Sequence, residues 1–223
     1  MQPAPEEEDL TARARIRDAA LRLFGEQGFD RATIRSIADA AGVSSGLVRH
    51  HFGSKEALRD ECDAYLARAL VRLNDQVRAH MSTSETNYLA VAVSVFAPYR
   101  SYIARTLVEG RVAPLFDTLT DLGAERLAEL DEKRADPPEV SRDARATVAA
   151  AMSLSVSVLY EHVSRRLGVD VFSAEGQGLL ARILLDIYSH PWLDPEEAAT
   201  LRARLPEGSG SGEGSVEEKA RDD

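Results

Sequence analysis

A polar run near the N-terminus, Ser44–His51, holds the side chains best suited to chemistry with another molecule. Arg49 carries a planar fork of donors that can form two hydrogen bonds with the edge of a guanine base. Ser45 can bond a base or a phosphate, and Leu47 can contact the methyl group of thymine. A phosphate contact and a solvated surface position are the alternatives for Arg49. These residue types at neighbouring positions indicate contact with double-stranded DNA.

Two short helices and a tight turn must position this run. The first helix, expected over residues 33–40, has one apolar face, at helical spacing, made of Ile34, Ile37, Ala38 and Ala41. Gly42 can adopt the left-handed conformation that ends a helix, and Ser44 is a good N-cap for a second one. Val48 and Phe52 are four residues apart and point inward together. The pattern predicts a helix-turn-helix whose second helix enters the major groove.

Two further residues suggest a partner close to the backbone. Gly46 is unfavourable inside a helix by about 1 kcal/mol relative to alanine, so its presence suggests that something approaches the helix closely. Lys55 stands in the first turn of the next helix, where a cation opposes the helix dipole, and a bound anion would explain it. The expected DNA contacts, to bases or to the phosphate backbone, are Thr33, Arg35, Ser44, Ser45, Gly46, Leu47, Arg49, His50, His51 and Lys55.

The residues of this region follow a familiar order. The positions concerned are Ile16, Ala19, Ala20, Leu23, Phe24, Gly28, Phe29, Thr33, Ile37, Ala38, Ala41, Gly42, Val43, Ser44, Gly46, Phe52, Ser54, Lys55, Glu56, Ala57 and Leu58. In this order they resemble the TetR family (TetR/AcrR) of bacterial transcription regulators, over the first quarter of the chain. The family often has an aromatic residue, usually tyrosine, at the position of Arg49, so the base preference of other members does not transfer.

The resemblance implies an all-α fold, with a three-helix DNA-binding head and a larger helical ligand-binding and dimerisation domain. It implies a ligand-responsive repressor, released from a palindromic operator by a small molecule. The alternative is a helical-bundle small-molecule-binding protein or enzyme with no DNA role. We expect no catalytic residues, cofactor or metal ion, because no phosphate loop, catalytic triad or metal-ligand spacing appears. Adjacent His50 and His51 point apart on a helix and make a poor metal site.

Composition agrees with a DNA-binding head on an acidic body. The 223 residues are 44% hydrophobic and 29% charged, with a net charge of −10. From Leu10 to Lys55, however, eight cationic and four anionic side chains give a net charge of +4. The single cysteine, Cys62, favours a reducing compartment, and the most apolar run, residues 88–97, is half the roughly 20 residues of a membrane span. We therefore expect a cytoplasmic protein without a membrane segment.

The rest of the chain predicts helices separated by glycine, proline and capping residues. Residues 1–9 are expected to form a disordered arm, 10–54 the DNA-binding domain, 55–205 the effector-binding and dimerisation domain, and 206–223 a disordered tail. The expected helices are residues 11–27, 33–40, 45–51, 55–80, 84–96, 99–108, 112–134, 141–167, 174–190 and 195–205.

Two late helices are candidates for subunit contacts. The helix at 142–167 is rich in small residues such as Ala146 and Ala150, which allow close helix approach, and the helix at 174–189 has a wide apolar stripe that includes Leu184. An ordinary monomer core is the alternative interpretation. Because members of the resembled family pair their last two long helices as a four-helix bundle, we expect a homodimer through these helices.

The middle helices carry amphipathic side chains that suit the wall of an apolar pocket. They suit a helical core equally well, and the family resemblance favours the pocket. The residues expected to bind the unknown small-molecule effector are Tyr65, Phe96, Tyr99, Tyr102, Arg105, Phe116, Met152 and Tyr160.

Overall fold

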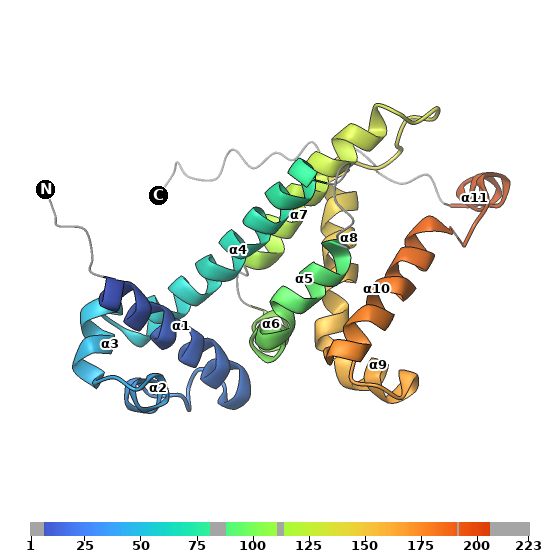
Figure 1. Cartoon of the computed structure of the whole chain (residues 1–223). Coiled ribbons are helices and arrows are strands. Elements are labelled where there is room, and N and C mark those ends of the chain that lie inside the picture. Colours follow the sequence, from blue (N-terminus) through green and yellow to red (C-terminus); the bar gives the residue numbers. More distant parts are fainter. Residues whose placement is uncertain (1–6, 81–87, 111–113, 191, 206–223) are drawn as a thin grey trace, which may run out of the picture.

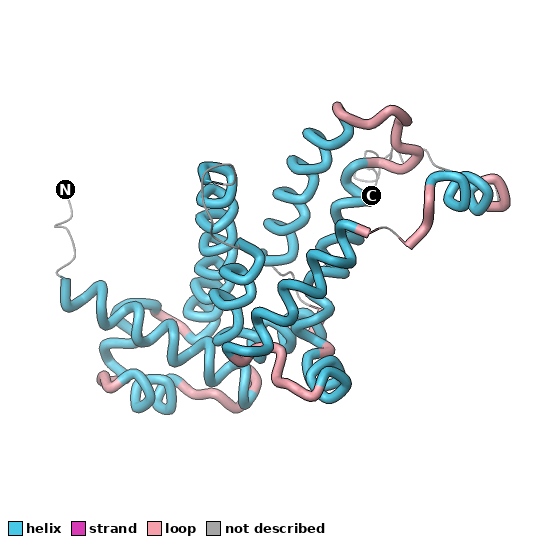
Figure 2. The backbone as a smooth tube through the Cα atoms, turned by 45° about the vertical axis from the view of Figure 1, so that its right-hand side comes forward, coloured by secondary structure: helices cyan, strands magenta, loops and turns pink. Residues whose placement is uncertain are grey.

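The computed structural model describes residues 7–80, 88–110, 114–190 and 192–205, and this part of the chain contains helices but no strand (Figures 1 and 2). The all-α prediction is therefore confirmed. The helices are α1 (Glu7–Gln27), α2 (Ile34–Ala41), α3 (Ser45–Phe52), α4 (Lys55–His80), α5 (Tyr88–Phe96), a 3₁₀ turn (Ala97–Tyr99), α6 (Arg100–Val108), α7 (Pro114–Asp131), α8 (Arg142–Val158), α9 (Tyr160–Leu167), α10 (Ala174–Ser189) and α11 (Pro195–Arg202).

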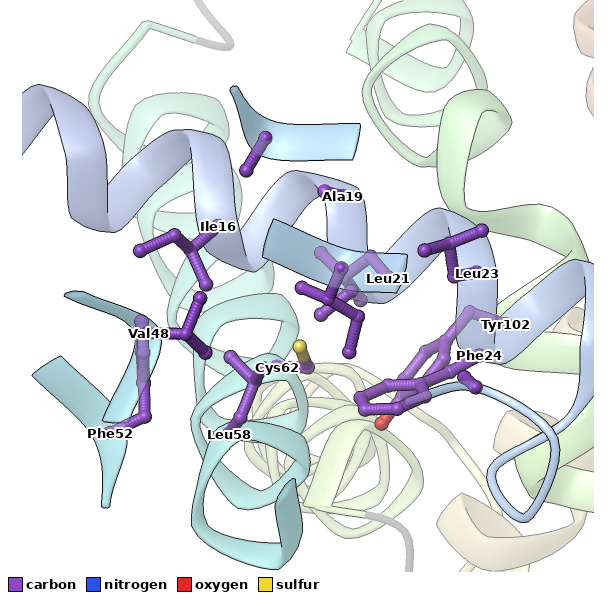
Figure 3. Packing of buried hydrophobic residues seen from close by; sticks show 14 of the residues in the cluster. Ile16, Ala19, Leu21, Leu23, Phe24, Val48, Phe52, Leu58, Cys62 and Tyr102 are labelled. Carbon is purple, nitrogen blue, oxygen red and sulfur yellow. The ribbon is translucent and has the colours of Figure 1, made fainter. Parts of the chain in front are cut away.

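Helices α1 to α3 and the first half of α4 form the head, which has a fully apolar core. Figure 3 shows Val48 of α3 beside Ile16 of α1 and Leu58 of α4. All three side chains are fully buried. Removal of such side chains from water stabilises a fold by about 1.5–3 kcal/mol each. This shared core holds α3 at a set angle to α1.

The head core does not end at the predicted domain boundary. Cys62 and Leu66 of α4, Tyr102 and Ile103 of α6, and Leu115 of α7 belong to the same buried cluster. The helix α4 continues past them and packs against α7, so one rigid rod connects the two halves of the molecule (Figure 1). The buried core of the head therefore includes side chains from beyond residue 54, and the domain division there stays a prediction.

The body consists of α5 to α10. Helix α7 packs along α8, α8 also contacts α6, and α5 packs on α10. Figure 1 shows α11 apart from these helices, beyond the end of α10. The body thus contacts α4 through α7 and the head through α6, which packs on α1.

Several predicted boundaries change. Residues 7–9 belong to α1 and not to a disordered arm, whereas residues 1–6, the cap at Ser84 and the tail 206–223 lie outside the described residues. The helix expected over 141–167 is bent by 67° at Leu159 into α8 and α9. Pro98 interrupts the chain within the 3₁₀ turn, as predicted.

No single helix of the described part is long and apolar enough to cross a membrane, and α8 with α9 meets the length and composition criteria only as a sharply bent pair.

Candidate nucleic-acid interface and ligand cavity

Local hydrogen bonds fix the helix-turn-helix. Thr33 is the N-cap of α2: its hydroxyl accepts from the N–H of Ser36 at 3.0 Å, and its own N–H donates to the Ser36 hydroxyl at 3.0 Å. Gly42 ends α2 in the left-handed region, with φ of 67°, where a glycine has no steric penalty. The hydroxyl of Ser44 then accepts from the N–H of Leu47 at 3.1 Å and starts α3. The angle between the two helices therefore follows from three short-range caps.

Helix α3 divides into a buried and an open face. Val48 and Phe52 point into the head core, and Gly46, Arg49 and His50 are exposed on the other side. The other predicted residues divide in the same way: Thr33, Arg35 and Ser44 are exposed, while Ser45, Leu47 and His51 are half-buried. The structure thus brings nine of the ten predicted residues to the surface of one helix-turn-helix. Their contact with DNA stays a prediction.

Gly46 has no structural need to be glycine within the chain. A Cβ atom built there would meet only the Ser44 hydroxyl oxygen within 4 Å, at 3.7 Å, and its φ lies outside the range that favours glycine. The space in front of this position is therefore open. An absent side chain at an open position is useful when an external surface must approach the backbone.

Lys55 has hydrogen-bond partners within the chain. Its ammonium donates to the carbonyl oxygens of Phe29 at 2.9 Å and Ala32 at 3.1 Å, and it lies 4.2 Å from the centre of the Phe29 ring. Arg59 stacks on the same ring at 3.7 Å. The cation at the start of α4 therefore stabilises the loop between α1 and α2, and these carbonyls account for its position without a bound anion. A contact between Lys55 and a DNA phosphate stays a prediction.

The sequence carried no signal for the role of Arg13. Its guanidinium lies 4.9 Å from the centre of the Phe52 ring and 3.2 Å from the carboxylate of Glu61. A cation over an aromatic face is stabilising by roughly 0.5–1 kcal/mol at an exposed site. Arg13 therefore links α1, α4 and the end of α3, and it helps to orient α3.

The largest described cavity lies in the body, with a volume of about 280 Å³. It is lined by residues from α4 to α8 and α10 and by Phe172 of the loop between α9 and α10. Of the eight predicted effector residues only Phe96 lines it. The other seven lie outside this lining, on α4, the 3₁₀ turn, α6, α7, α8 and α9.

The other seven predicted effector residues have other environments. Tyr102 donates its hydroxyl to the buried carboxylate of Asp63 at 2.6 Å, and Arg105 donates Nε to the carbonyl of Gly25 at 3.1 Å. Both therefore connect α6 to the head and not to a ligand. Met152 is 62% exposed on the outside of α8.

Aromatic pairs account for three more of these residues. The rings of Tyr65 and Tyr99 pack edge to face at 6.0 Å, and Arg17 lies 3.6 Å above the ring of Tyr65. Tyr160 packs on Phe172 at 6.0 Å, and Phe116 is half-buried in α7 outside the cavity lining. Tyr65, Tyr99 and Tyr160 therefore have packing partners within the protomer, and their contact with an effector stays a prediction.

The expected subunit face also changes. Ala146 and Ala150 are buried inside the protomer, where Ala146 faces Gly123 of α7, and Leu184 lines the cavity. The exposed apolar side chains on these helices are Val148, Met152, Val158, Leu185, Ile187 and Tyr188. The exposed apolar side chains therefore lie on a different face of each helix from the predicted positions Ala150 and Leu184, and on α10 the exposed Leu185 directly follows Leu184.

Within the described residues no group of three or more His, Cys, Asp or Glu side chains could hold a metal ion. Cys62 is fully buried, and burial strongly raises the pKa of its thiol. A thiol of this kind packs as a small apolar group.

Comparison with known proteins matches residues 16–62 to the family described as bacterial regulatory proteins, tetR family. The transcriptional regulatory protein RaaS of Mycobacterium tuberculosis is 41% identical over 142 residues, which is 62% of this chain and 65% of that protein. The repressor KstR2 of Rhodococcus jostii is 51% identical over 49 residues, 22% of this chain and 24% of that protein. The chain thus spans less than two thirds of the length of these relatives.

Solved structures share the fold at low sequence identity. The fatty acid degradation regulator FadR from Bacillus halodurans superposes with a TM-score of 0.56 at 20% identity, over 86% of this chain and 100% of that one. CprB from Streptomyces coelicolor, solved with its operator sequence, gives 0.53 at 21% identity, over 78% and 88% of the two chains. The helix-turn-helix region of this chain, residues 16–62, is therefore similar to the tetR family of bacterial regulatory proteins, and the described helices share the fold of the solved structures.

Proposed function

We propose that this protein is a homodimeric transcriptional repressor of the bacterial cytoplasm, without enzymatic activity, that leaves a palindromic operator when a small molecule occupies the body cavity. The exposed face of α3 carries the proposal. Gly46, Arg49 and His50 are open to solvent there, while Val48 and Phe52 anchor the helix from behind. A firmly anchored helix with an open polar face suits the major groove, where base edges are read.

A second copy of the chain would pair its α8 and α10 with those of the first. The exposed side chains Val148 and Met152 of α8 and Leu185 and Ile187 of α10 offer an apolar surface to such a partner. A two-fold dimer presents two reading helices to half-sites about 34–36 Å apart. Two copies therefore explain both the exposed apolar side chains and a palindromic DNA site.

Helix α6 supplies a physical route from the cavity to the head. Ile103 of α6 lines the cavity, and a Cβ atom on Gly25 of α1 would lie 2.7 Å from the backbone nitrogen of Tyr102. The two helices therefore touch backbone to backbone, and α6 cannot move toward α1 without displacing it. A ligand that shifts α6 would change the position of α3, and coupling of about 1–3 kcal/mol is usual for such systems.

The hydrogen bond between Tyr102 and Asp63 strengthens this contact. Burial raises the pKa of the Asp63 carboxyl, and the hydrogen bond from Tyr102 opposes that rise. A buried polar pair is well defined only while both partners stay in place. The pair therefore ties the position of α6 to that of α4.

Selection from a randomised duplex library at about 150 mM salt tests the proposal. We expect enrichment of an inverted repeat with half-sites one helical turn apart, and loss of this enrichment with Arg49→Ala. A second candidate is a small-molecule-binding protein without a DNA role, which the body cavity favours. Recovery of no sequence above the unselected library would support that candidate and overturn the repressor.

A further inference from the structure

The body cavity suits an apolar ligand. Among the described residues that line it, the side chains are aliphatic or aromatic except for the hydroxyls of Ser153, Ser157 and Tyr188, and none carries a charge. An apolar cavity of about 150 Å³ binds benzene, so 280 Å³ gives room for roughly ten non-hydrogen atoms. A charged group placed in the middle of this lining would lose its hydration without compensation.

A guanidinium lies beside the wall of this cavity. Arg100 is on α6 one turn before Ile103 and one turn after Phe96, and both of these residues line the cavity. The central carbon of its guanidinium is 5.8 Å from the ring centre of Phe172, which is also part of the lining, and 5.5 Å from that of Tyr160. The cation thus lies next to an aromatic residue in the wall of an otherwise uncharged space.

The donors of Arg100 are poorly used within the described part of the chain. One terminal nitrogen donates to the carbonyl of Ala97 at a long 3.3 Å, and Nε is buried without a hydrogen-bond partner. No carboxylate of the described residues pairs with it, whereas Arg145 is paired with Asp131 at 2.6 Å. A buried donor without a partner is costly, and an anion at this position would satisfy it.

We propose that the effector is an amphiphile with one carboxylate, which pairs with Arg100 while its uncharged apolar body fills the cavity. The guanidinium can keep its face on the aromatic rings while its edge donates to the carboxylate, a geometry that lysine cannot reproduce. This inference rests on the proposed function in taking the cavity as the effector site. It adds the chemical class of the ligand and the residue that selects it.

Calorimetric titration of the full chain with octanoate, 1-octanol and methyl octanoate tests this. Hydrogen bonds to charged groups contribute about 1.5–3 kcal/mol, so octanoate should bind wild type roughly tenfold or more tightly than the two uncharged probes. Arg100→Gln should weaken octanoate at least tenfold and leave 1-octanol unchanged. Arg165→Gln, at an exposed arginine of α9, is the matched control and should change neither.

Failure of octanoate to bind, equal affinity for octanoate and 1-octanol, or unaltered octanoate binding by Arg100→Gln each overturns the proposal. Arg100→Lys keeps the charge and should retain part of the preference for octanoate, which separates the ionic contact from loss of folding. Circular dichroism of each variant monitors the fold. Because this titration contains no DNA, its outcome is independent of the library selection: octanoate binding without an enriched operator would remove the repressor and keep the ligand class.

Discussion

The head and the body of this molecule differ in how tightly their apolar side chains are packed. In the head, Ile16, Phe24, Ile37 and Val48 are almost completely buried, and the core they form has no large described cavity. In the body, α8 and α10 bury mainly small residues, enclose a cavity of about 280 Å³ and leave large apolar side chains such as Met152 in solvent. The apolar side chains of the head are buried within one chain, whereas the body leaves a cavity and exposed apolar side chains.

This difference fits the function proposed for each half. A reading helix has to meet base edges with little error, so tight packing and short-range caps are an advantage. A body that responds to a ligand needs at least two arrangements of similar free energy, and loose packing supplies them. The predictions below test this contrast, from the largest expected effect to the smallest.

Met152→Glu should have the largest effect, because it places a charge on the exposed apolar face of α8 where a second copy is proposed to bind. A charge buried at a two-fold interface costs about 3–5 kcal/mol if unpaired, and symmetry introduces it twice. The dimer should dissociate at micromolar concentration in sedimentation velocity, while the helical content of the head persists. Val140→Glu, at an exposed loop residue outside α8, is the control. A dimer that survives Met152→Glu would place the interface elsewhere.

Phe24→Ala tests the packing of the head core. The ring contacts Phe29 and Tyr102 and is 1% exposed, so truncation should lower the free energy of unfolding by about 3–5 kcal/mol. Leu119→Ala, at the edge of the body cavity, should lower it by less than about 2 kcal/mol, because less of its side chain is packed. Urea titrations at one protein concentration measure both. Equal losses would contradict the packing contrast.

Lys55→Met separates a structural cation from a DNA-binding one. Loss of its charged hydrogen bonds to Phe29 and Ala32 should destabilise the head by about 1.5–3 kcal/mol, with no change in the salt dependence of DNA affinity. Arg35→Ala should do the opposite: stability should be nearly unchanged, and the slope of log affinity against log salt should fall by about 0.9 per subunit. A flatter slope for Lys55→Met would restore its role as a phosphate contact.

Arg49→Ala tests base reading on the open face of α3. Specific operator affinity should fall by about 1–3 kcal/mol per half-site, and the melting temperature should not change because the side chain is exposed. Competition with scrambled DNA provides the control. An equal loss for both DNA molecules would make Arg49 a phosphate contact.

Gly46→Ala should have the smallest effect of the five substitutions, and it should raise stability where the others lower it or leave it unchanged. The open space at this position allows a methyl group, so the variant should be more stable by up to about 1 kcal/mol. DNA affinity should nevertheless decrease, because the methyl group stands where the duplex would approach. Thermal unfolding and operator titration measure the two effects. Unchanged DNA affinity would show that nothing comes close to this helix.

The sequence was most informative where structure depends on near neighbours. Gly42 and Ser44 predicted the turn, because the C-cap of α2 and the N-cap of α3 involve residues only a few positions apart. The hydrogen bonds of Lys55 were not predicted, because its partners, Phe29 and Ala32, lie 26 and 23 residues away. No local pattern reports such partners.

The body was predicted less well for a related reason. The bend at Leu159 has neither proline nor glycine, and the backbone there simply leaves the helix with φ of −98° and ψ of 12°. Helical spacing placed Phe96 and Tyr102 on equal terms, but only packing decided that one faces the cavity and the other faces Asp63. Side-chain environment depends on neighbouring helices, which composition and spacing leave open.

The continuous helix α4 has a consequence for dissection of the chain into fragments. A fragment that stops at residue 54 would lack Leu58, Cys62 and Leu66. The apolar side chains of α1 that belong to the same cluster would then face water. Extension to residue 80 restores these three side chains but still omits Tyr102 and Ile103 of α6. Because α4 packs in both the head and the body, denaturant should unfold the two halves in a single cooperative transition. A fragment that ends directly after the helix-turn-helix should therefore not fold into a DNA-binding unit.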